Sequence, residues 1–443
     1  MSLQRMIDHA LAETPPGRSV WVALSGGLDS SLLLTLAAAA AHRYPRPLRA
    51  LHVHHGLQPA ADDFERHCRR LCSRLGVPLH VERVAVDLAA GKGHEGAARE
   101  ARYSVFARRV APGETLWLAQ HLNDQAETFL LAALRGSGVR GLAGMAKDRA
   151  WRGRRLERPL LAIARSTLEA EAVQRGLAWV EDPSNDEETL DRNFLRHAVL
   201  PLLASRWPHA GDALSRSAAL AGQADLLLDE LAGLDLEGLG GDATCLPVSG
   251  LLALSGPRRR LLIRHGCHHQ GLPTPPSRRL ETLLDQLDAK AGAEVRVAWP
   301  GAEARVWRGR LHLLAPPEPL PPGWQAEWDG HSPLVTPLGE VRASLGRADG
   351  APVRLQVRPR RGGERLRLPG RGRRDLKRLL QELGVPPWER GRLLVIWEGE
   401  TPVAILDPLN EAWLVLAEGW ISRGAAPGRS PRPAGRPPPA PGR

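Results

Sequence analysis

Short apolar runs alternate with amphipathic segments along the first half of the chain. The runs carry the β-branched and aromatic residues typical of buried strands, and the segments repeat apolar positions every three or four residues, as helices do. Four run–segment pairs follow one another, at residues 20–25 and 29–41, 48–55 and 61–76, 78–86 and 94–110, and 114–121 and 124–136. Repeated strand–helix units predict an α/β fold, a Rossmann-like parallel sheet with helices on both faces.

The pattern changes after about Trp207. Residues 212–234 and 277–289 have the spacing of amphipathic helices, and residues 293–314 alternate like two paired strands. A Pro-rich stretch at 315–324 indicates a linker, and the last residues contain almost no large apolar side chains. We therefore expect five parts: an α/β domain at 1–206 with ligand sites at the carboxyl ends of its strands, a mostly helical domain at 207–314, a linker region at 315–345, a basic α+β domain at 346–422, and a disordered basic tail at 423–443.

Composition places the chain among soluble proteins. Of its 443 residues, 43% are hydrophobic and 25% are charged, and no apolar stretch reaches the roughly 18 residues of a membrane helix. The first residues lack the apolar core of a secretory signal, so we expect a cytoplasmic protein without a membrane partner. Four cysteines are too few for a disulfide framework in so long a chain, and Cys68 and Cys72 are expected to be free thiols.

The positive charge is concentrated near the C-terminus. The formal net charge is +11, and residues 354–392 contain 13 basic and 4 acidic residues. Such density favours a nucleic-acid surface, although a solvated charged face is the alternative. The candidate phosphate contacts are Arg360, Arg361, Arg365, Arg371, Arg373, Arg374, Lys377 and Arg378.

The segment Ser25–Ser30, SGGLDS, joins the first predicted strand to the first predicted helix. Glycines permit a tight turn and a close approach to a ligand, and the free amides at a helix start bind anions. Asp29 beside a bound phosphate is best explained by a Mg²⁺ ion between the two. The alternative is a plain strand–turn–helix corner. The turn has neither the Lys of a Walker loop nor the spacing of a dinucleotide-binding fingerprint.

The SGGLDS segment resembles the PP-loop of the ATP pyrophosphatases, which cleave ATP to AMP and pyrophosphate. The resemblance implies that the loop grips the pyrophosphate part of ATP. The nucleotide-site candidates are therefore Ser25, Gly26, Gly27, Leu28, Asp29 and Ser30. We add His54, which ends the second strand at the same edge of the sheet.

Further motifs narrow the resemblance. They lie at residues 53–58, 93–106, 119–145, 158–161, 181–203 and 358–396. In this order they resemble the tRNA(Ile)-lysidine synthetase family over about 400 residues. The resemblance implies a ligase that uses ATP to adenylate the wobble cytidine of an isoleucine tRNA with a CAU anticodon, and then L-lysine to displace AMP. Lysidine pairs with A instead of G, so the tRNA changes from a methionine to an isoleucine identity. The sequence leaves a monomer and a homodimer open.

Two acidic residues at a predicted helix start are the candidates for lysine and metal contacts. Asp124 and Glu127 are three apart, hence on one face, and they match the second Asp and the Glu of the family pattern. The alternative is that they only complement the helix dipole. Gln120 and Asn123 stand where we align the pattern's His and first Asp. Asn accepts a hydrogen bond but brings no charge.

Several polar residues with helical spacing are candidates for contacts to the tRNA or the adenylated base. Arg192, Asn193 and Arg196 are one such group, and ion pairing of the arginines with Asp186 or Glu187 is the alternative. Arg99 fits either a wall of the site or a helix-surface ion pair.

Two other functions remain open. A tRNA 2-thiolation enzyme with the same loop typically needs a C-x-x-C pair, which the sequence lacks. A tRNA-binding protein that has lost catalysis is suggested by Gln120 and Asn123.

Overall fold

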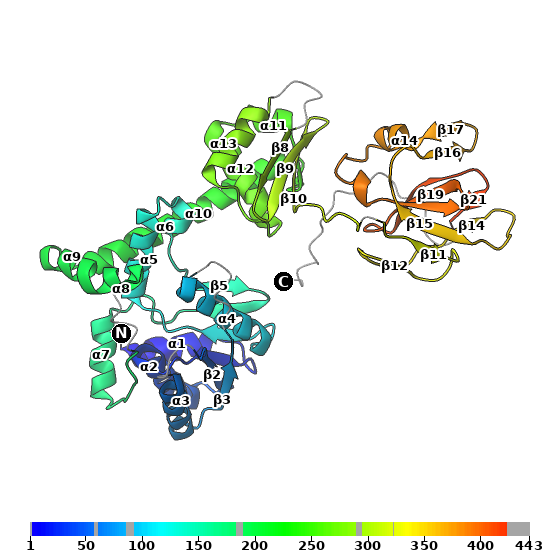
Figure 1. Ribbon diagram of the computed structural model, residues 1–443. Helices are drawn as coiled ribbons and strands as arrows, with labels where there is room; N and C mark the ends of the chain where they lie inside the picture. Colours follow the sequence, from blue (N-terminus) through cyan, green and yellow to red (C-terminus); the bar gives the residue numbers. More distant parts are fainter. Residues whose placement is uncertain are drawn as a thin grey trace. The chain divides into compact units, whose positions relative to one another are not determined.

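The computed structural model describes residues 2–56, 61–85, 93–182, 189–288, 295–321 and 323–422. The chain divides into two compact units, Met1–Leu227 and Leu228–Arg443 (Figure 1). Each unit is described by itself. In the described part of the chain, no helix is long and apolar enough to span a membrane.

A six-stranded sheet forms the centre of the first unit. Its strand order is β3-β2-β1-β4-β6-β5, and every neighbouring pair is parallel except β5 with β6. The strands are β1 (Val20–Ala23), β2 (Leu48–His54), β3 (Leu79–Arg83), β4 (Thr115–Trp117), β5 (Asp148–Trp151) and β6 (Arg154–Glu157). This confirms the predicted parallel sheet, to which β5 adds an antiparallel edge.

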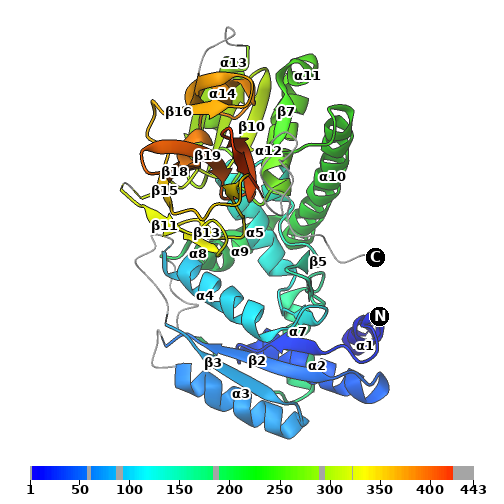
Figure 2. The ribbon, with the colours of Figure 1, turned by 90° about the vertical axis from the view of Figure 1, so that its right-hand side faces the viewer.

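Helices cover both faces of this sheet (Figure 2). One face packs against α1 (Leu3–Glu13), α2 (Leu28–Arg43), α3 (Ala61–Leu75) and α7 (Arg165–Gln174), and the other against α4 (Gly93–Arg109). Alternation along β1 explains the two cores. Val20 and Val22 are buried on the α2 side, whereas Trp21 is buried with Phe106 of α4.

The remaining helices of the first unit follow β4 and α7. They are α5 (Leu122–Leu134), α6 (Val139–Leu142), α8 (Asp191–Phe194), a π-helix (Leu195–Val199) and α9 (Leu200–Arg206). The helix α10 (Ala210–Gly238) runs across the boundary between the units.

The second unit begins with a four-stranded sheet of order β7-β10-β9-β8. Its strands are β7 (Cys245–Pro247), β8 (Val295–Trp299), β9 (Ala302–Trp307) and β10 (Arg310–Leu314), with helices α11 (Val248–Ala253), α12 (Gly256–His269) and α13 (Ser277–Gln286). The segment predicted as two strands contains three, because its turns are only two residues long.

An antiparallel sheet of order β11-β15-β18-β19-β20 follows. Its strands are β11 (Ala326–Trp328), β15 (Leu355–Pro359), β18 (Leu394–Glu398), β19 (Thr401–Asp407) and β20 (Ala412–Leu416). Three two-stranded sheets accompany it: β12 (Leu334–Thr336) with β13 (Gly339–Val341), β14 (Gly346–Arg347) with β21 (Trp420–Ile421), and β16 (Arg365–Leu368) with β17 (Gly372–Asp375). The helix of this part is α14 (Leu376–Glu382).

The structure differs from the predicted linker at 315–345. Trp328 and Leu334 in this segment are buried, and β11 pairs with β15. The Pro-rich start suggested a linker, but these apolar side chains join the core of the sheet that follows. The predicted disordered tail at 423–443 lies outside the described residues, and the exact domain limits stay predictions.

Candidate active site

The loop between β1 and α2 is closed by its own serines. Ser30 Oγ accepts hydrogen bonds from the amides of Ser25, at 3.1 Å, and Gly26, at 3.2 Å. The Ser25 and Ser30 hydroxyls lie 2.9 Å apart. These bonds fix the turn before any ligand binds, so the loop is preorganised.

Gly26 is required by conformation and by space. Its φ is +97°, a region that other residues rarely adopt. A Cβ atom here would lie 3.0 Å from Phe64 Cδ1 and 3.3 Å from Cys68 Sγ of α3. The loop therefore packs directly on α3, and only glycine fits.

The amino end of α2 is open to an anion. Gly27 is the N-cap residue and has no side chain to satisfy the first amides of the helix. The helix dipole adds a partial positive charge at this end. Both features favour a phosphate group, as the sequence predicts for Gly27 and Leu28.

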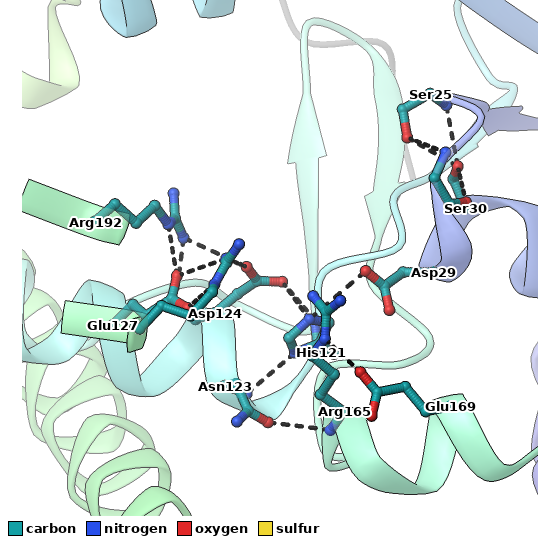
Figure 3. A network of polar contacts seen from close by, with 12 residues as sticks. Ser25, Asp29, Ser30, His121, Asn123, Asp124, Glu127, Arg165, Glu169 and Arg192 are labelled. Carbon is teal, nitrogen blue, oxygen red and sulfur yellow. Dashed lines mark hydrogen bonds and ion pairs between the residues drawn. The ribbon is translucent and has the colours of Figure 1, made fainter. Parts of the chain in front are cut away.

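Asp29 lies in the first turn of α2 and points toward α5 (Figure 3). Its Oδ1 is buried with no hydrogen-bond partner among the described residues, and its Oδ2 lies 3.7 Å from His121 Nε2. Burial raises the pKa of Asp29, while His121 and Arg165 act to lower it. A buried carboxylate oxygen without a partner, beside an anion site, fits a cation such as Mg²⁺. That ion commonly binds one or two carboxylates together with substrate phosphates. The described residues contain no group of three or more His, Cys, Asp or Glu that could hold a metal alone.

His121 joins the loop to α5. It is buried, it is the N-cap residue of α5, and its Nδ1 accepts from the amide of Asn123 at 3.2 Å. In the neutral ring the proton is therefore on Nε2, which faces Asp29 and, at 3.6 Å, Asp124 Oδ2. His121 thus stands between two of the predicted acidic residues.

Glu127 is held by two arginines from the segment after α7. Its Oε2 accepts from Arg192 Nε at 2.8 Å, and its Oε1 accepts from Arg196 Nε at 2.7 Å. Arg196 Nη2 adds a contact of 3.1 Å to Oε2. The Glu127 side chain is 0% exposed, and the two arginine side chains are 26% and 22% exposed. The predicted shared face of Arg192 and Arg196 is confirmed, and it meets α5.

Asp124 has more than one task. Its Oδ2 accepts from the amide of His121 at 3.0 Å, which completes a capping box, and its Oδ1 lies 3.4 Å from Arg196 Nη2. The alternative foreseen for this residue, support of the helix start, is therefore present. The side chain nevertheless keeps 16% exposure, so of these two α5 acids it is the one that a solute can reach.

Gln120, which we align with the pattern's histidine, contacts Arg158 and not Asp29. Gln120 Oε1 accepts from Arg158 Nε at 3.0 Å, whereas the neighbouring His121 lies in the site. Asn123 Oδ1 accepts from the amide of Arg165, the first residue of α7, at 3.1 Å. A neutral amide oxygen performs this capping task, which explains how the uncharged residue is accommodated.

Sequence reasoning missed Arg165 and Glu169. Arg165 Nε pairs with Glu169 Oε1 at 2.8 Å, and its charge acts on both Asp29 and Asp124. The sequence indicates Arg165 only weakly. A cation at the amino end of a helix is unfavourable for the helix dipole, so such an arginine indicates a nearby carboxylate that compensates.

Other predicted residues are placed as follows. His54 ends β2 at the same sheet edge as the loop, with Nε2 3.2 Å from Asp62 Oδ1. Asn193 is buried on α8. Arg99 lies on α4 over the ring of Tyr103 and makes no contact with the Asp124–Glu127 network among the described contacts. Asp186 and Glu187, the alternative arginine partners, lie outside the described residues.

The predicted basic cluster is on the surface of the second unit. Leu366, Leu368 and Leu376 face a core while the cluster faces solvent, and only Arg360 is half-buried. Arg371 pairs with Glu382 at 2.8 Å, and Arg360 lies 3.8 Å from Glu364. The exposed members are Arg361, Arg365, Arg371, Arg373, Arg374, Lys377 and Arg378.

The four cysteines are free and buried. Burial raises the pKa of Cys72 to about 11 and of Cys267 to about 12. These thiols stay protonated near neutral pH, where sulfur transfer needs a thiolate.

The loop, the helix after it and the parallel sheet define the class. Residues 1–203 match the PP-loop domain family, so the first unit contains a PP-loop domain. Residues 246–312 match the TilS substrate binding domain, and residues 355–410 match the TilS substrate C-terminal domain.

Relatives along the whole chain specify the family. The chain is 45% identical over 420 residues to a tRNA(Ile)-lysidine synthase of Xanthomonas axonopodis pv. citri, covering 94% of both chains. It is also 45% identical over 420 residues to one of Alkalilimnicola ehrlichii, covering 92% of this chain and 93% of that one. The chain belongs to the tRNA(Ile)-lysidine synthase family. Among solved structures it resembles the U34-tRNA thiolase NcsA of Methanococcus maripaludis at a TM-score of 0.41 and 17% identity, over 49% of this chain and 77% of that one.

Proposed function

We propose that this protein ligates L-lysine to the wobble cytidine of an isoleucine tRNA with a CAU anticodon, at the expense of ATP. One observation carries the proposal. Asp29 presents a buried oxygen, without a hydrogen-bond partner among the described residues, at the open amino end of α2, and its other oxygen faces His121, which also faces Asp124. An anion site and an acidic site thus lie side by side, as a reaction between ATP and an amino acid requires.

ATP binds with its phosphates against the first amides of α2, at Leu28, Asp29 and Ser30, and against the Ser25 hydroxyl. Ser30 Oγ instead shapes the loop, because it already accepts from the amides of Ser25 and Gly26. The helix amides and the Ser25 hydroxyl stabilise the charge that develops on the leaving pyrophosphate when the cytidine O2 attacks the α-phosphate. Asp29 would hold Mg²⁺ against the phosphates, and the ion supplies further charge neutralisation. His54 borders the same sheet edge and completes the nucleotide site.

The acids of α5 differ in task. We assign the lysine ammonium to Asp124, because its side chain is 16% exposed and that of Glu127 is 0% exposed. Glu127 positions Arg192 and Arg196. We assign both arginines, with the neighbouring Asn193, to contacts with the tRNA or the adenylated base. Attack of the lysine amine on C2 then expels AMP and gives lysidine.

The tRNA is expected to contact the basic cluster of the second unit as well as the active site. Seven exposed basic residues on β16, β17, α14 and the adjoining turns suit phosphate contacts. Because tRNA, ATP and lysine are its substrates, we expect the protein to act in the cytoplasm. The function requires no second copy of the chain, so a homodimer stays a prediction.

The test is direct formation of lysidine. The full chain is incubated with ATP, Mg²⁺, lysine and the tRNA transcript, and nucleosides from the digested tRNA are identified by mass. We expect lysidine with wild type and with a Glu171→Gln control, whose carboxylate pairs with Arg175 along α7. Labelled AMP on the tRNA without lysidine would contradict the ligase reaction, and binding without AMP release would favour the inactive tRNA-binding alternative.

A further inference from the structure

The β5–β6 hairpin is strongly basic, although it is not part of the cluster in the second unit. Residues 147–155, KDRAWRGRR, contain five basic residues and one acid. The turn is made by Arg152, at φ +50°, and Gly153, at φ +74°. This two-residue turn projects the hairpin at the antiparallel edge of the sheet, next to α4.

Two aromatic rings lie between these charges. Tyr103 of α4 and Trp151 of β5 are edge to face, with centroids 5.6 Å apart. The Arg99 guanidinium lies 4.9 Å from the centroid of Tyr103, and those of Arg152 and Arg154 lie 6.0 and 5.8 Å from that of Trp151. Aromatic rings interleaved with arginines are the arrangement that single-stranded nucleic acids bind.

A hollow opens beside Tyr103. Its volume is about 320 Å³, and its walls are Gly96, Arg99, Glu100, Tyr103 and Arg149. The hollow is shallow and open to solvent, so a planar ring could lie against Tyr103 without being enclosed.

The walls are fixed rather than loose. Arg154 donates to the carbonyl oxygens of Ala107, at 2.8 Å, and Val110, so it ties the hairpin to the end of α4. Tyr103 also packs edge to face on the buried Phe106, with centroids 5.6 Å apart. The ring is thus held in place. The Arg99 guanidinium lies over it, so a stacked base either displaces that guanidinium or uses the other face of the ring.

Three cations at or beside the hollow have no ion pair within the described part of the chain. Among the described residues, no carboxylate forms an ion pair with Arg99, Arg149 or Arg152, and all three are exposed. Burial lowers the pKa of Arg158, and Arg149 and Arg99 lower it further, while Tyr103 opposes the shift. A polyanion would relieve this crowding of positive charge.

A short chain of contacts leads from the hollow to the active site. Arg158 faces Tyr103, and its Nε donates to Gln120 Oε1 at 3.0 Å. The next residue, His121, faces Asp29 and Asp124. A nucleotide in the hollow would therefore be a near neighbour of the nucleotide under reaction.

We propose that this hollow is a stacking site for an unpaired base of the tRNA that neighbours the modified cytidine, with Tyr103 as the stacking ring and Arg99 and Arg149 as phosphate contacts. The proposal rests on the proposed function, since it takes a tRNA as the ligand. It assigns the hollow a positioning role: holding a neighbouring base keeps the target cytidine beside Asp29 and Asp124.

Binding of the tRNA transcript to the full chain tests this site. Tyr103→Leu should weaken binding by roughly 5-fold to 150-fold, the range for loss of one base–aromatic stack. Tyr103→Phe keeps the ring and should bind like wild type. Arg149→Gln should reduce the logarithmic salt slope by about 0.7 to 0.9. Arg108→Gln is the matched control, because Arg108 is exposed on the opposite side of α4.

A second measurement locates the base. An anticodon stem-loop carrying 5-iodouridine at one loop position at a time should cross-link to Tyr103 in wild type from one position and not in Tyr103→Leu. Undiminished tRNA affinity of Tyr103→Leu, with ATP binding also intact, overturns the proposal, as does a cross-link that persists in this variant. If wild type forms no lysidine but Tyr103→Leu still loses tRNA binding, the proposed function fails and the stacking site stands.

Discussion

Replacement of Glu127 by Gln tests whether Glu127 positions the two arginines, as proposed, or binds the substrate lysine. Gln has the same shape, but it has one acceptor oxygen and no charge. In the native protein the carboxylate accepts three contacts from Arg192 and Arg196, at 2.7 to 3.1 Å. At least one of these must be lost, and the amide NH₂ of Gln would face a guanidinium.

The expected loss of stability follows from these contacts. A hydrogen bond to a charged group contributes about 1.5–3 kcal/mol, and removal of one partner from a buried ion pair costs about 3–5 kcal/mol. Because both arginine side chains are about a quarter exposed to solvent, water can partly replace the lost carboxylate oxygen in the variant. We therefore expect the free energy of unfolding to fall by about 2–4 kcal/mol. The melting temperature should fall by about 2–4 °C for each kcal/mol in a unit of this size.

Activity should fall in both half-reactions, because misplaced arginines affect the adenylation and the lysine step alike. The assay follows α-labelled ATP into adenylated tRNA and then into free AMP at increasing lysine. Glu171→Gln is the control: it removes the same group from an i,i+4 pair with Arg175 on α7, which contributes about 0.3–0.5 kcal/mol. Native stability, normal adenylation and rescue by high lysine in Glu127→Gln would refute this reasoning and make Glu127 the lysine contact.

Four further variants probe the other parts of the site. Asp124→Asn keeps an oxygen for the His121 amide but loses the charge, so half-saturation by lysine should need about 10–100 times more lysine, with adenylation retained; an unchanged lysine dependence removes Asp124 from the pocket. Asp29→Ala should abolish adenylation with an unchanged melting temperature, and AMP formation at the wild-type rate excludes it from the mechanism. Gly26→Ala should destabilise the loop by about 1–3 kcal/mol and weaken ATP binding, because of its φ of +97° and the nearby Phe64 ring; calorimetry measures both. Alanine at Arg371, Arg373 and Arg374 together should lower the salt slope of tRNA binding by about 2; an unchanged slope shows a solvated face.

The sheet of the first unit could be predicted because its central strands are apolar on both faces. The strands β5 and β6 were not predicted, since DRAW and RRLE are polar segments of only four residues each, and β5 lies at the edge of the sheet. The same reasoning explains the segment at 315–345. The prolines at its start predicted a linker, whereas the burial of Trp328 depends on strands that lie 27 or more residues later in the sequence.

The sequence predicted which residues belong to the candidate site, but not which of them contact one another. Helical spacing placed Asp124 with Glu127, and Arg192 with Arg196, on shared faces. Nothing local indicates that the two faces meet, because 65 to 72 residues separate the partners. His121 shows a related difficulty. Its place at a helix start three residues before Asp124 fits a capping box, but only the tertiary structure brings Asp29 to its other nitrogen.

Asn123 bears on the charge state of Asp29. Burial raises the pKa of Asp29, and the Asp124 carboxylate adds to this shift, whereas His121, Arg165 and Arg196 act to lower it. A carboxylate at position 123 would cap α7 equally well, but it would bring a further negative charge and raise the pKa of Asp29 more. The neutral amide keeps the structural bond without that charge, which favours the ionised form of Asp29 that a cation requires.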